Sequence, residues 1–349
     1  MKTISVLVVD DSAFMRRVIT DIIQSDPQLK VVDSAKNGRE AIEKIKSMVP
    51  DVVTMDVEMP IMDGISALKQ IMLEKPVPVV MLSSLTKEGA DATVKALGIG
   101  AIDFITKPTS IFKMNTEEMK RQLCNQIKIA AKVNMRTQSA AGSQKQVNLR
   151  NASSFNNLDM KKIVAIGTST GGPRALQEVI PYLPQNIPAS ILVVQHMPPG
   201  FTKSLAERLN NISSIHVKEA EHDDVLKAGH AYVAPGDHHI KVERISNTYR
   251  IKLSKEPLVS GHRPSVDMMM NSLAQLELNN VVGVIMTGMG SDGATGMKNI
   301  KAHNAYTIAQ DEETCVVYGM PKSAVKLGCI DKIVPLHEIA NTIINVVGV

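Results

Sequence analysis

Tryptophan is absent from this 349-residue chain, and aromatic residues make up only 3% of it. The interior must therefore be filled with aliphatic side chains and with methionine, of which the chain has 20. A chain of this length exceeds what one ordinary hydrophobic core holds, so we expect two domains. The hydrophobic share of 44% and the charged share of 21% are ordinary for a globular protein.

Cysteines are scarce as well, and the three that occur, Cys124, Cys315 and Cys329, lack metal-binding spacing. This pattern excludes a disulfide scaffold and favours reduced thiols. The apolar run near the N-terminus is interrupted at Asp10-Asp11, so we expect no signal peptide, and no apolar stretch is long enough to span a membrane. We therefore expect a cytoplasmic protein that meets membranes only through its partners.

The net charge of +4 is concentrated in one segment. Residues 120–162 carry nine basic side chains and one acidic one, whereas the flanking regions are each slightly acidic. A DNA-binding output domain is expected to show the opposite distribution, so we expect no DNA partner. The basic segment either solvates a linker or docks an acidic partner.

Strand and helix patterns alternate through the first 110 residues. Amphipathic helices are predicted at Ala13–Ser25, Gly38–Met48, Ile65–Leu73 and Ala90–Leu97, with a further helix after Asn115. The intervening apolar runs predict buried strands at Ile4–Val9, Val31–Ala35, Val52–Met55, Val77–Leu82 and Asp103–Ile105. This alternation predicts an α/β domain, residues 1–120, with a (βα)5 parallel sheet covered on both faces.

A flexible basic linker is predicted next, over residues 121–160, because Gln, Ser, Asn, Ala and Gly dominate from Thr137 to Asp159. Residues 161–349 then predict a second doubly wound, mostly parallel α/β domain with a β-hairpin at His239–Val242 and Tyr249–Leu253. Its other strands are predicted at Ile163–Ile166, Ser190–Gln195 and Val281–Met286. Its helices are predicted at Pro173–Tyr182, Phe201–Leu209, Ser265–Gln275 and Gly293–His303.

Three acidic residues, Asp10, Asp11 and Asp56, follow the first and third predicted strands. The carboxyl ends of parallel strands meet at one edge, where crowded carboxylates need a hard cation such as Mg²⁺. Ser83 and Lys107 end two further strands, where a hydroxyl and an ammonium could contact a phosphoryl group. Any one of these residues is explained equally well as a turn former or cap, but all five together favour a phosphoacceptor site.

The strings VLVVDD, TMDVEMPIMDG and FITKP make the first 120 residues resemble a receiver domain of two-component signalling. The resemblance implies that Asp56 accepts a phosphoryl group from a histidine kinase while Asp10, Asp11 and Asp56 hold Mg²⁺. It also implies a cis bond between Lys107 and Pro108. Three residues take switch roles by the same resemblance, namely Ser83, Phe104 and Lys107.

A second group of strand-end residues consists of Ser169, His196 and Asp292. Ser169 lies on a glycine-flanked turn between a strand and a helix, where its hydroxyl is exposed and backbone N–H groups are near. Serine needs a base and a group that orients the base, and His196 and Asp292 each follow a buried strand. The three could converge at one crevice, which is the arrangement that nucleophilic acyl transfer requires.

Other interpretations of these motifs remain open. A glycine-rich turn can bind a dinucleotide, but the next strand ends in Gln195-His196 rather than in an acidic residue. The order of Ser169, His196 and Asp292 along the chain differs from that of α/β-hydrolases. The sequence Asp237-His238-His239 could suggest a metal, although adjacent residues of a strand point to opposite faces.

Residues 162–325 resemble the catalytic domain of chemotaxis protein-glutamate methylesterases through GTSTGGPRAL, VVQHMPPGFT, APGDHH, GHRPSVD and TGMGSDGATG. The resemblance implies Ser169 as nucleophile, His196 as general base and acid, and Asp292 as the orienting carboxylate. It also implies backbone oxyanion donors near Thr170 and Met289. Arg263 either contacts an acidic substrate segment or forms a structural salt bridge.

These features together predict a phosphorylation-regulated serine esterase that demethylates chemoreceptor glutamates and deamidates receptor glutamines. Its partners are expected to be a histidine kinase and methyl-accepting receptors, and the protein is expected to be a monomer that needs Mg²⁺ only for phosphorylation. We further expect the unphosphorylated receiver to cover the Ser169 crevice. Two alternatives are a receiver-regulated hydrolase of another ester and a non-catalytic response regulator.

Overall fold

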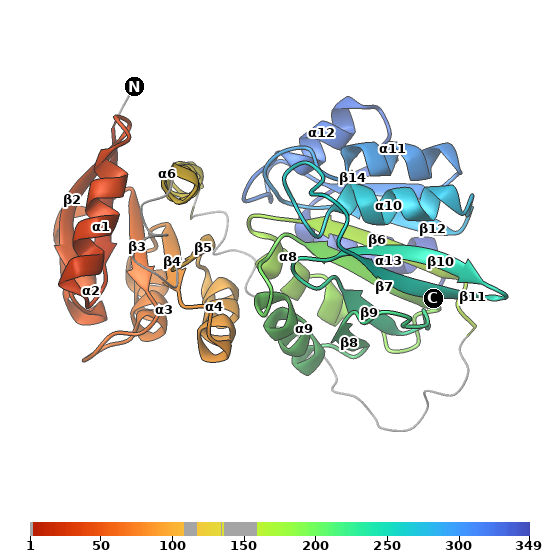
Figure 1. Ribbon diagram of the computed structural model, residues 1–349, viewed down its shortest axis with the longest axis horizontal. Coiled ribbons are helices and arrows are strands. Elements are labelled where there is room, and N and C mark those ends of the chain that lie inside the picture. The colour runs from red at the N-terminus through yellow and green to blue at the C-terminus, as the bar shows by residue number, and fades with distance from the viewer. Residues whose placement is uncertain (1–2, 108–116, 134, 136–158) are drawn as a thin grey trace. The chain divides into compact units, whose positions relative to one another are not determined.

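The structure is a computed structural model that describes residues 3–107, 117–133, 135 and 159–349. The chain divides into two compact units, Met1–Ala140 and Ala141–Val349 (Figure 1). Most of the predicted linker, together with Pro108 and Asn115, lies outside the described residues. The domain boundaries at residues 120 and 160 therefore stay predictions.

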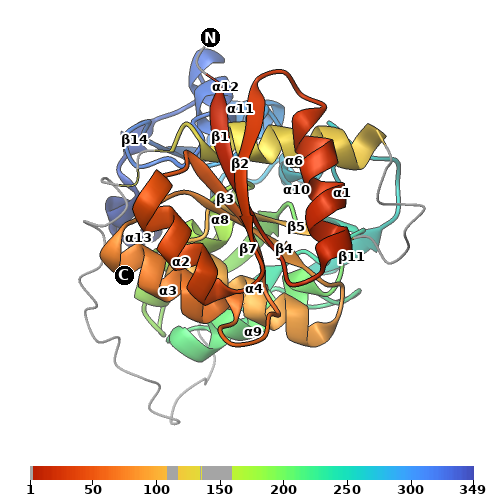
Figure 2. The same ribbon diagram turned by 90° about the vertical axis from the view of Figure 1, so that its left-hand side faces the viewer.

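The first unit is built on a five-stranded parallel sheet in the order β2-β1-β3-β4-β5. Its strands are β1 (Ile4–Val9), β2 (Leu29–Ala35), β3 (Val52–Asp56), β4 (Val79–Ser83) and β5 (Asp103–Thr106). Its helices are α1 (Ala13–Gln24), α2 (Gly38–Met48), α3 (Gly64–Glu74), α4 (Lys87–Ile99) and α6 (Glu117–Ala130). Helices α1 and α6 lie together on one face of the sheet, and α2, α3 and α4 lie on the other (Figure 2). The predicted (βα)5 sheet is confirmed.

Side-chain caps fix where the first four helices begin. In each case a short polar side chain accepts a hydrogen bond from a backbone N–H of the first turn, which otherwise has no partner within the helix. The capping residues are Ser12, Asn37, Asp63 and Thr86. These caps therefore place the starts of the four helices at the carboxyl edge of the sheet.

The second unit contains a seven-stranded parallel sheet in the order β14-β13-β12-β6-β7-β9-β8 and the antiparallel hairpin β10-β11. The strands are β6 (Lys162–Thr168), β7 (Ala189–Gln195), β8 (His216–Glu219), β9 (His230–Val233), β10 (His239–Ile245), β11 (Thr248–Ser254), β12 (Val281–Ile285), β13 (Tyr306–Gln310) and β14 (Lys332–Val334). The predicted mostly parallel sheet and its hairpin are confirmed. Strand order reverses between β6 and β12, where ligands of open α/β sheets bind.

Helices cover both faces of this second sheet. They are α8 (Gly172–Gln177), the 3₁₀ turn η2 (Ile180–Tyr182), α9 (Phe201–Ile212), α10 (Val266–Gln275), α11 (Ala294–Ala302), α12 (Met320–Lys326) and α13 (Leu336–Val347). Helices α10, α11 and α12 pack together on one face, and α8 and α9 lie on the other (Figure 1). Met269, Met270 and Met297 are fully buried between sheet and helices, as expected of a core that is poor in aromatics.

The structure differs from the sequence prediction at three places. No strand was predicted at His216–Glu219, where the structure has β8. The single helix predicted over Pro173–Tyr182 ends at Gln177 and is followed by η2. Pro181 explains the break, because it cannot donate a backbone hydrogen bond to the carbonyl of Gln177, and its ring would clash with that carbonyl in a continuous helix. The sequence prediction also assigned no elements after residue 303, where the structure has β13, α12, β14 and α13.

No helix in the described part of the chain has the length and apolar composition needed to cross a membrane.

Gly167 provides a test of how closely the sheet packs behind the second site. A Cβ atom there would lie 2.4 Å from Val266 Cγ1 and 3.2 Å from Ile285 Cδ1. We expect Gly167→Ala to lower the free energy of unfolding of the second unit by about 1–3 kcal/mol, because the core cannot admit the methyl group without moving. Denaturant titration of the full chain measures this.

The control is a double-mutant cycle with Val266→Ala, which removes the nearest methyl groups. The double variant should lose less stability than the two single variants add up to. Additive losses would contradict the proposed clash.

Candidate functional sites

Acidic side chains converge at the carboxyl edge of the first sheet. Asp10 and Asp11 follow β1, and Asp56 is the last residue of β3. Each offers a carboxylate oxygen, and these oxygens all lie within 4.8 Å of one another. Asp10 is fully buried, Asp56 is 5% exposed, and Asp11 is exposed. The structure therefore brings together the three residues predicted to bind Mg²⁺.

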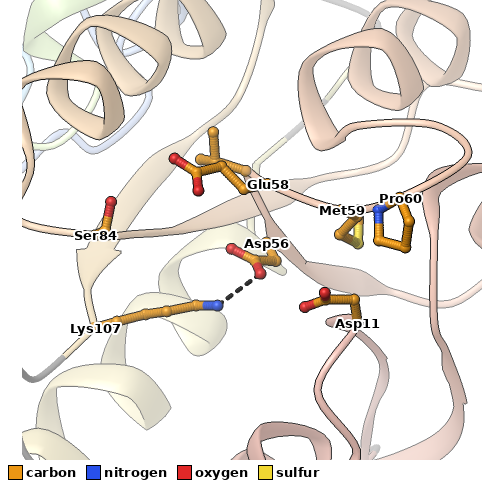
Figure 3. A pocket seen from close by; sticks show the side chains of 8 residues that line it. Asp11, Asp56, Glu58, Met59, Pro60, Ser84 and Lys107 are labelled. Carbon is orange, nitrogen blue, oxygen red and sulfur yellow. Dashed lines mark ion pairs between the residues drawn. The ribbon is translucent and has the colours of Figure 1, made fainter.

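Lys107, just after β5, forms ion pairs with two carboxylates of this cluster. Its Nζ lies 2.8 Å from Asp10 Oδ2. It lies 2.7 Å from Asp56 Oδ2, and this pair is marked by the dashed line in Figure 3. Burial raises the pKa of Asp56 to about 6, and the hydrogen bond from Lys107 offsets only part of that effect. Burial alone would lower the pKa of Lys107, but its hydrogen bonds to Asp10 and Asp56 raise it, so it stays charged.

A cleft of about 470 Å³ opens beside these groups and is lined in part by Asp11, Asp56, Glu58, Ser84 and Lys107 (Figure 3). The acidic residues that line the cleft, Asp11, Asp56 and Glu58, offer carboxylate oxygens as ligands. Such oxygens suit a hard divalent cation such as Mg²⁺. Asp11 leaves the cluster open to solvent on one side. The residues present therefore fit a hydrated Mg²⁺ and a phosphoryl group.

The predicted switch residues occupy distinct positions. Ser83 is fully buried, and its hydroxyl donates a hydrogen bond of 3.0 Å to the carbonyl of Gly89 in α4. The serine whose side chain lines the cleft is its neighbour, Ser84. Phe104 is buried within the sheet at 8% exposure. The predicted cis bond involves Pro108, which lies outside the described residues.

Ser169, His196 and Asp292 lie at the ends of three adjacent strands in the second unit. Ser169 follows β6, His196 follows β7, and Asp292 lies in the loop after β12. Strand β6 pairs in register with both β7 and β12, so these ends meet at one edge of the sheet. The topology thus brings together the three residues that the sequence singled out.

His196 and Asp292 form a direct pair, with His196 Nε2 2.8 Å from Asp292 Oδ2. Both side chains are almost completely buried, with 6% and 1% of their surface exposed. Asp292 also accepts hydrogen bonds from Ser265 Oγ at 2.8 Å, Val266 N at 2.7 Å and Asp267 N at 3.1 Å. Burial raises the pKa of Asp292, but these donors and His196 together hold it below its usual value. The carboxylate therefore stays ionised beside the imidazole.

The other ring nitrogen of His196 is left to exchange a proton. Nδ1 is buried and has no hydrogen-bond partner among the described residues. Ser169 is half-buried, and no hydrogen bond joins it to His196 in the described part of the chain. Contacts between a nucleophile and its base are often loose before substrate binds. Nδ1 is thus the ring atom that can accept the Ser169 proton.

His262 packs flat against His196. The ring centroids are 3.8 Å apart and the planes differ by 9°. Burial, together with the nearby His196, lowers the pKa of His262 to about 4, so its ring is neutral at pH 7. An uncharged, flat surface therefore restricts rotation of the His196 ring while Asp292 fixes its edge.

Arg263 anchors the loop that carries His262. Its guanidinium lies 2.9 Å (Nε) and 2.5 Å (Nη2) from Asp237 Oδ1. Its Nη1 donates to the carbonyls of Lys255 and Glu256 at 3.1 and 3.0 Å. Of the two roles considered for Arg263, the structure provides the structural salt bridge.

The peptide group that joins Gly288 to Met289, beside Ser169, is oriented by hydrogen bonds on its carbonyl side. The Gly288 carbonyl accepts from Gly319 N at 3.1 Å and Met320 N at 2.9 Å, where α12 begins. In a planar trans peptide the next N–H, that of Met289, points the opposite way. A Cβ on Gly288 would lie 2.8 Å from Ser169 Cβ, so this peptide packs directly against Ser169.

The histidines of the Asp237-His238-His239 sequence are engaged within the protein. His239 is fully buried; its Nδ1 accepts from Ser265 N at 3.2 Å, and its Nε2 donates to the Pro257 carbonyl at 3.1 Å. Within the described ranges, the acidic residues of the first unit are the group of three or more His, Cys, Asp or Glu side chains close enough to hold a metal. A metal ligand role for His239 is therefore not supported.

Comparison with known proteins was made for the whole chain. The family model of CheB methylesterase matches residues 164–343, and that of the response regulator receiver domain matches residues 6–117. A protein-glutamate methylesterase/protein-glutamine glutaminase of Pyrococcus horikoshii is 49% identical over 100% of this chain and 95% of its own length. One of the same name from Halalkalibacterium halodurans is 47% identical over 98% of both chains.

The chain belongs to the CheB methylesterase family. A solved structure, the CheB methylesterase catalytic domain of Thermotoga maritima, is 46% identical and superposes with a TM-score of 0.52, covering 53% of this chain and 97% of that one. The resemblance predicted from the sequence is confirmed, and so is the two-domain α/β fold class.

The sequence prediction did not identify several residues that surround the pair of His196 and Asp292 in this family member. Ser265 and His262 contact them from the segment GHRPSVD, and Gln195 precedes His196 directly. The signal was present, since both segments were among the strings that carried the resemblance. Only the fold shows that they meet at the same edge.

The pKa of His262 predicts a specific pH dependence of stability. Folding lowers this pKa from 6.5 to about 4, so the unfolded chain binds more protons than the folded one between about pH 4 and 6.5. Stability must then rise with pH across that interval. The free energy of unfolding of wild type should fall between pH 7 and pH 5. We expect it to fall by about 1–2 kcal/mol less in His262→Phe, which keeps a flat ring but cannot bind a proton.

Denaturant titrations at both pH values measure the difference. Wild type returned from pH 5 to pH 7 serves as the control for irreversible change. Equal losses in the two proteins would show that His262 is not held neutral by the fold.

Proposed function

We propose that this protein hydrolyses glutamate methyl esters on methyl-accepting chemoreceptors, and that it also deamidates receptor glutamines. The buried pair of His196 and Asp292 at the strand end beside Ser169 carries the proposal. The names of the relatives supply the reacting groups, glutamate methyl esters and glutamines of proteins, and the resemblance stated from the sequence supplies the chemoreceptors. We propose that the protein acts as a cytoplasmic monomer without DNA, and that it reaches membranes through the receptors.

In the proposed reaction, Ser169 Oγ attacks the γ-carbonyl of the ester while His196 Nδ1 accepts its proton. The carboxylate of Asp292 stabilises the imidazolium that results, because it is ionised and bonded to Nε2. His196 then returns the proton to the leaving methoxide, and methanol departs. Water attacks the acyl-enzyme by the same route and restores Ser169 and a free glutamate. With glutamine as substrate, ammonia leaves instead of methanol.

We assign the stabilisation of the oxyanion, the charged oxygen formed when Ser169 attacks the carbonyl, to the backbone N–H groups of Thr170 and Met289. Both peptides have their carbonyls bound on the far side, so their N–H groups are directed before the substrate arrives. A fixed donor of this kind is worth roughly 3–4 kcal/mol in the transition state. Thr170 is buried and Met289 is half exposed.

Regulation is assigned to the first unit, through transfer of a phosphoryl group from a histidine kinase to Asp56. Asp10, Asp11 and Asp56 would hold Mg²⁺, which neutralises the charge of the phosphoryl oxygens when bound. Lys107 reaches Asp56 at 2.7 Å and can contact the same oxygens. Ser83 would have to break its hydrogen bond to Gly89 to serve as the switch hydroxyl. Phe104 would serve with it as the switch aromatic residue.

The assignment of Ser169 is tested by methanol release from methylated chemoreceptor membranes. We expect Ser169→Ala to lower the rate by roughly 10³-fold or more, because no other group supplies the nucleophile. The matched control is Ser254→Ala, which removes a half-buried hydroxyl at the end of β11. Release that persists in Ser169→Ala would refute the serine mechanism, and no release by wild type would favour another ester or a non-catalytic regulator.

The assignment of Asp56 is tested with acetyl phosphate and Mg²⁺. We expect the phosphodonor to raise the rate of methanol release by wild type and to leave the rate of Asp56→Asn unchanged, because the amide cannot accept a phosphoryl group. Chelation with EDTA should remove the response of wild type. Asp21→Asn, at an exposed ion pair of α1, is the control, and stimulation of Asp56→Asn would place the phosphoacceptor elsewhere.

A further inference from the structure

Gln195 is a buried amide placed between the strands that carry Ser169 and His196. It is the last residue of β7 and is only 2% exposed. Its Oε1 accepts a hydrogen bond of 2.6 Å from Thr168 Oγ1. Its Nε2 donates to the carbonyl of Ser169 at 3.0 Å and to that of His196 at 3.1 Å. Both ends of the amide are therefore bonded, and both of its acceptor residues belong to the catalytic group.

The position of Gln195 matters because the backbone ladder ends there. Thr168 and Gln195 are the last register pair of β6 and β7, and one further bond runs from His196 N to Thr168 O at 3.3 Å. Beyond this point β6 and β7 continue into separate loops. The amide of Gln195 continues the connection with side-chain hydrogen bonds and thus ties the backbone of the nucleophile to that of the base.

The same amide determines the direction of an oxyanion donor. The Ser169 carbonyl accepts from Gln195 Nε2 and from Gly172 N, at 3.0 and 2.8 Å. Because the peptide is planar and trans, the N–H of Thr170 points away from these donors. Loss of the bond from Gln195 would leave this peptide with one restraint in place of two.

The turn that follows Ser169 is shaped around the amide. A Cβ atom on Gly172 would lie 2.0 Å from Gln195 Oε1 and 2.7 Å from Thr168 Cβ. Glycine is therefore required where α8 begins, and the helix approaches the amide more closely than any other residue would allow.

We propose that Gln195 is a positioning residue for the esterase: its amide sets the placement of Ser169 and His196 and the direction of the Thr170 N–H. The proposal rests on the proposed function for the identity of the reaction. In the proposed reaction Gln195 does not contact the substrate. Its contribution should appear in kcat, because the geometry of attack and the oxyanion contact change, and hardly in KM.

Two variants test the proposal in the full-length protein. Gln195→Met keeps the volume and removes every hydrogen bond, whereas Gln195→Glu keeps an acceptor for Thr168 and removes both donors. We expect kcat for methanol release to fall about 10- to 100-fold in both variants, with KM within about threefold of wild type. Labelling of Ser169 by a fluorophosphonate probe should slow by a similar factor.

Thr307→Val is the matched control for the loss of a buried hydrogen bond. Thr307 is fully buried in β13, and its hydroxyl bonds to the Cys329 carbonyl at 2.7 Å and to Asp331 at 2.9 Å. We expect it to lower the unfolding midpoint while kcat and labelling stay at the wild-type level. A fall in kcat that merely tracks the unfolding midpoint across all three variants would overturn the positioning role.

The outcomes separate this proposal from the assigned reaction. If wild type releases methanol and both Gln195 variants keep its kcat, the positioning role is wrong and the function stands. If wild type releases no methanol, the substrate assignment fails, and the labelling rates alone decide the role of Gln195. Labelling at the wild-type rate in Gln195→Glu, which keeps the shape of the side chain, would refute it in either case.

Discussion

Parallel pairing of neighbouring strands is the constraint on which both sites depend. A parallel ladder aligns the carboxyl ends of its strands, so residues far apart in the chain meet at one edge. Asp10, Asp56 and Lys107 meet in this way in the first sheet, and Ser169 and His196 do so in the second. A slip in strand register would separate each group, and the fully buried strands make such a slip costly.

The two sites differ in how completely hydrogen bonds and ion pairs stabilise a buried carboxylate, and the difference suits their proposed roles. Asp292 has four hydrogen-bond donors, and its pKa falls below the usual value in spite of burial. Asp56 has Lys107 as its cationic partner, shared with Asp10, and its pKa rises to about 6. A fixed anion is what an imidazolium needs beside it. The charge of Asp56 is only partly neutralised by Lys107. The site can therefore take up a further cation and adjust to the charge that a phosphoryl group adds.

Most strands and the residues at their ends could be predicted from sequence, because buried parallel strands form continuous apolar runs and polar residues mark where they stop. The break before Pro181 was missed because the apolar pattern continues past it, although the proline itself signals the break. Two other features could not be predicted in this way. The short strand β14 has two of its three residues exposed, so it lacks the apolar run. The contacts of His262 and Gln195 join loops and strands that only the finished topology brings together.

The candidate catalytic geometry therefore depends on atoms that would never contact a substrate. Each proposed oxyanion N–H belongs to a peptide whose carbonyl is bound behind it. Gln195 and Gly172 bind the carbonyl in one case, and Gly319 and Met320 do so in the other. His196 is held at its edge by Asp292 and across its face by His262. Such restraints are set when the chain folds, so the site needs little reorganisation during the reaction. Substitutions behind the site should consequently slow the chemistry while leaving the substrate entrance unchanged.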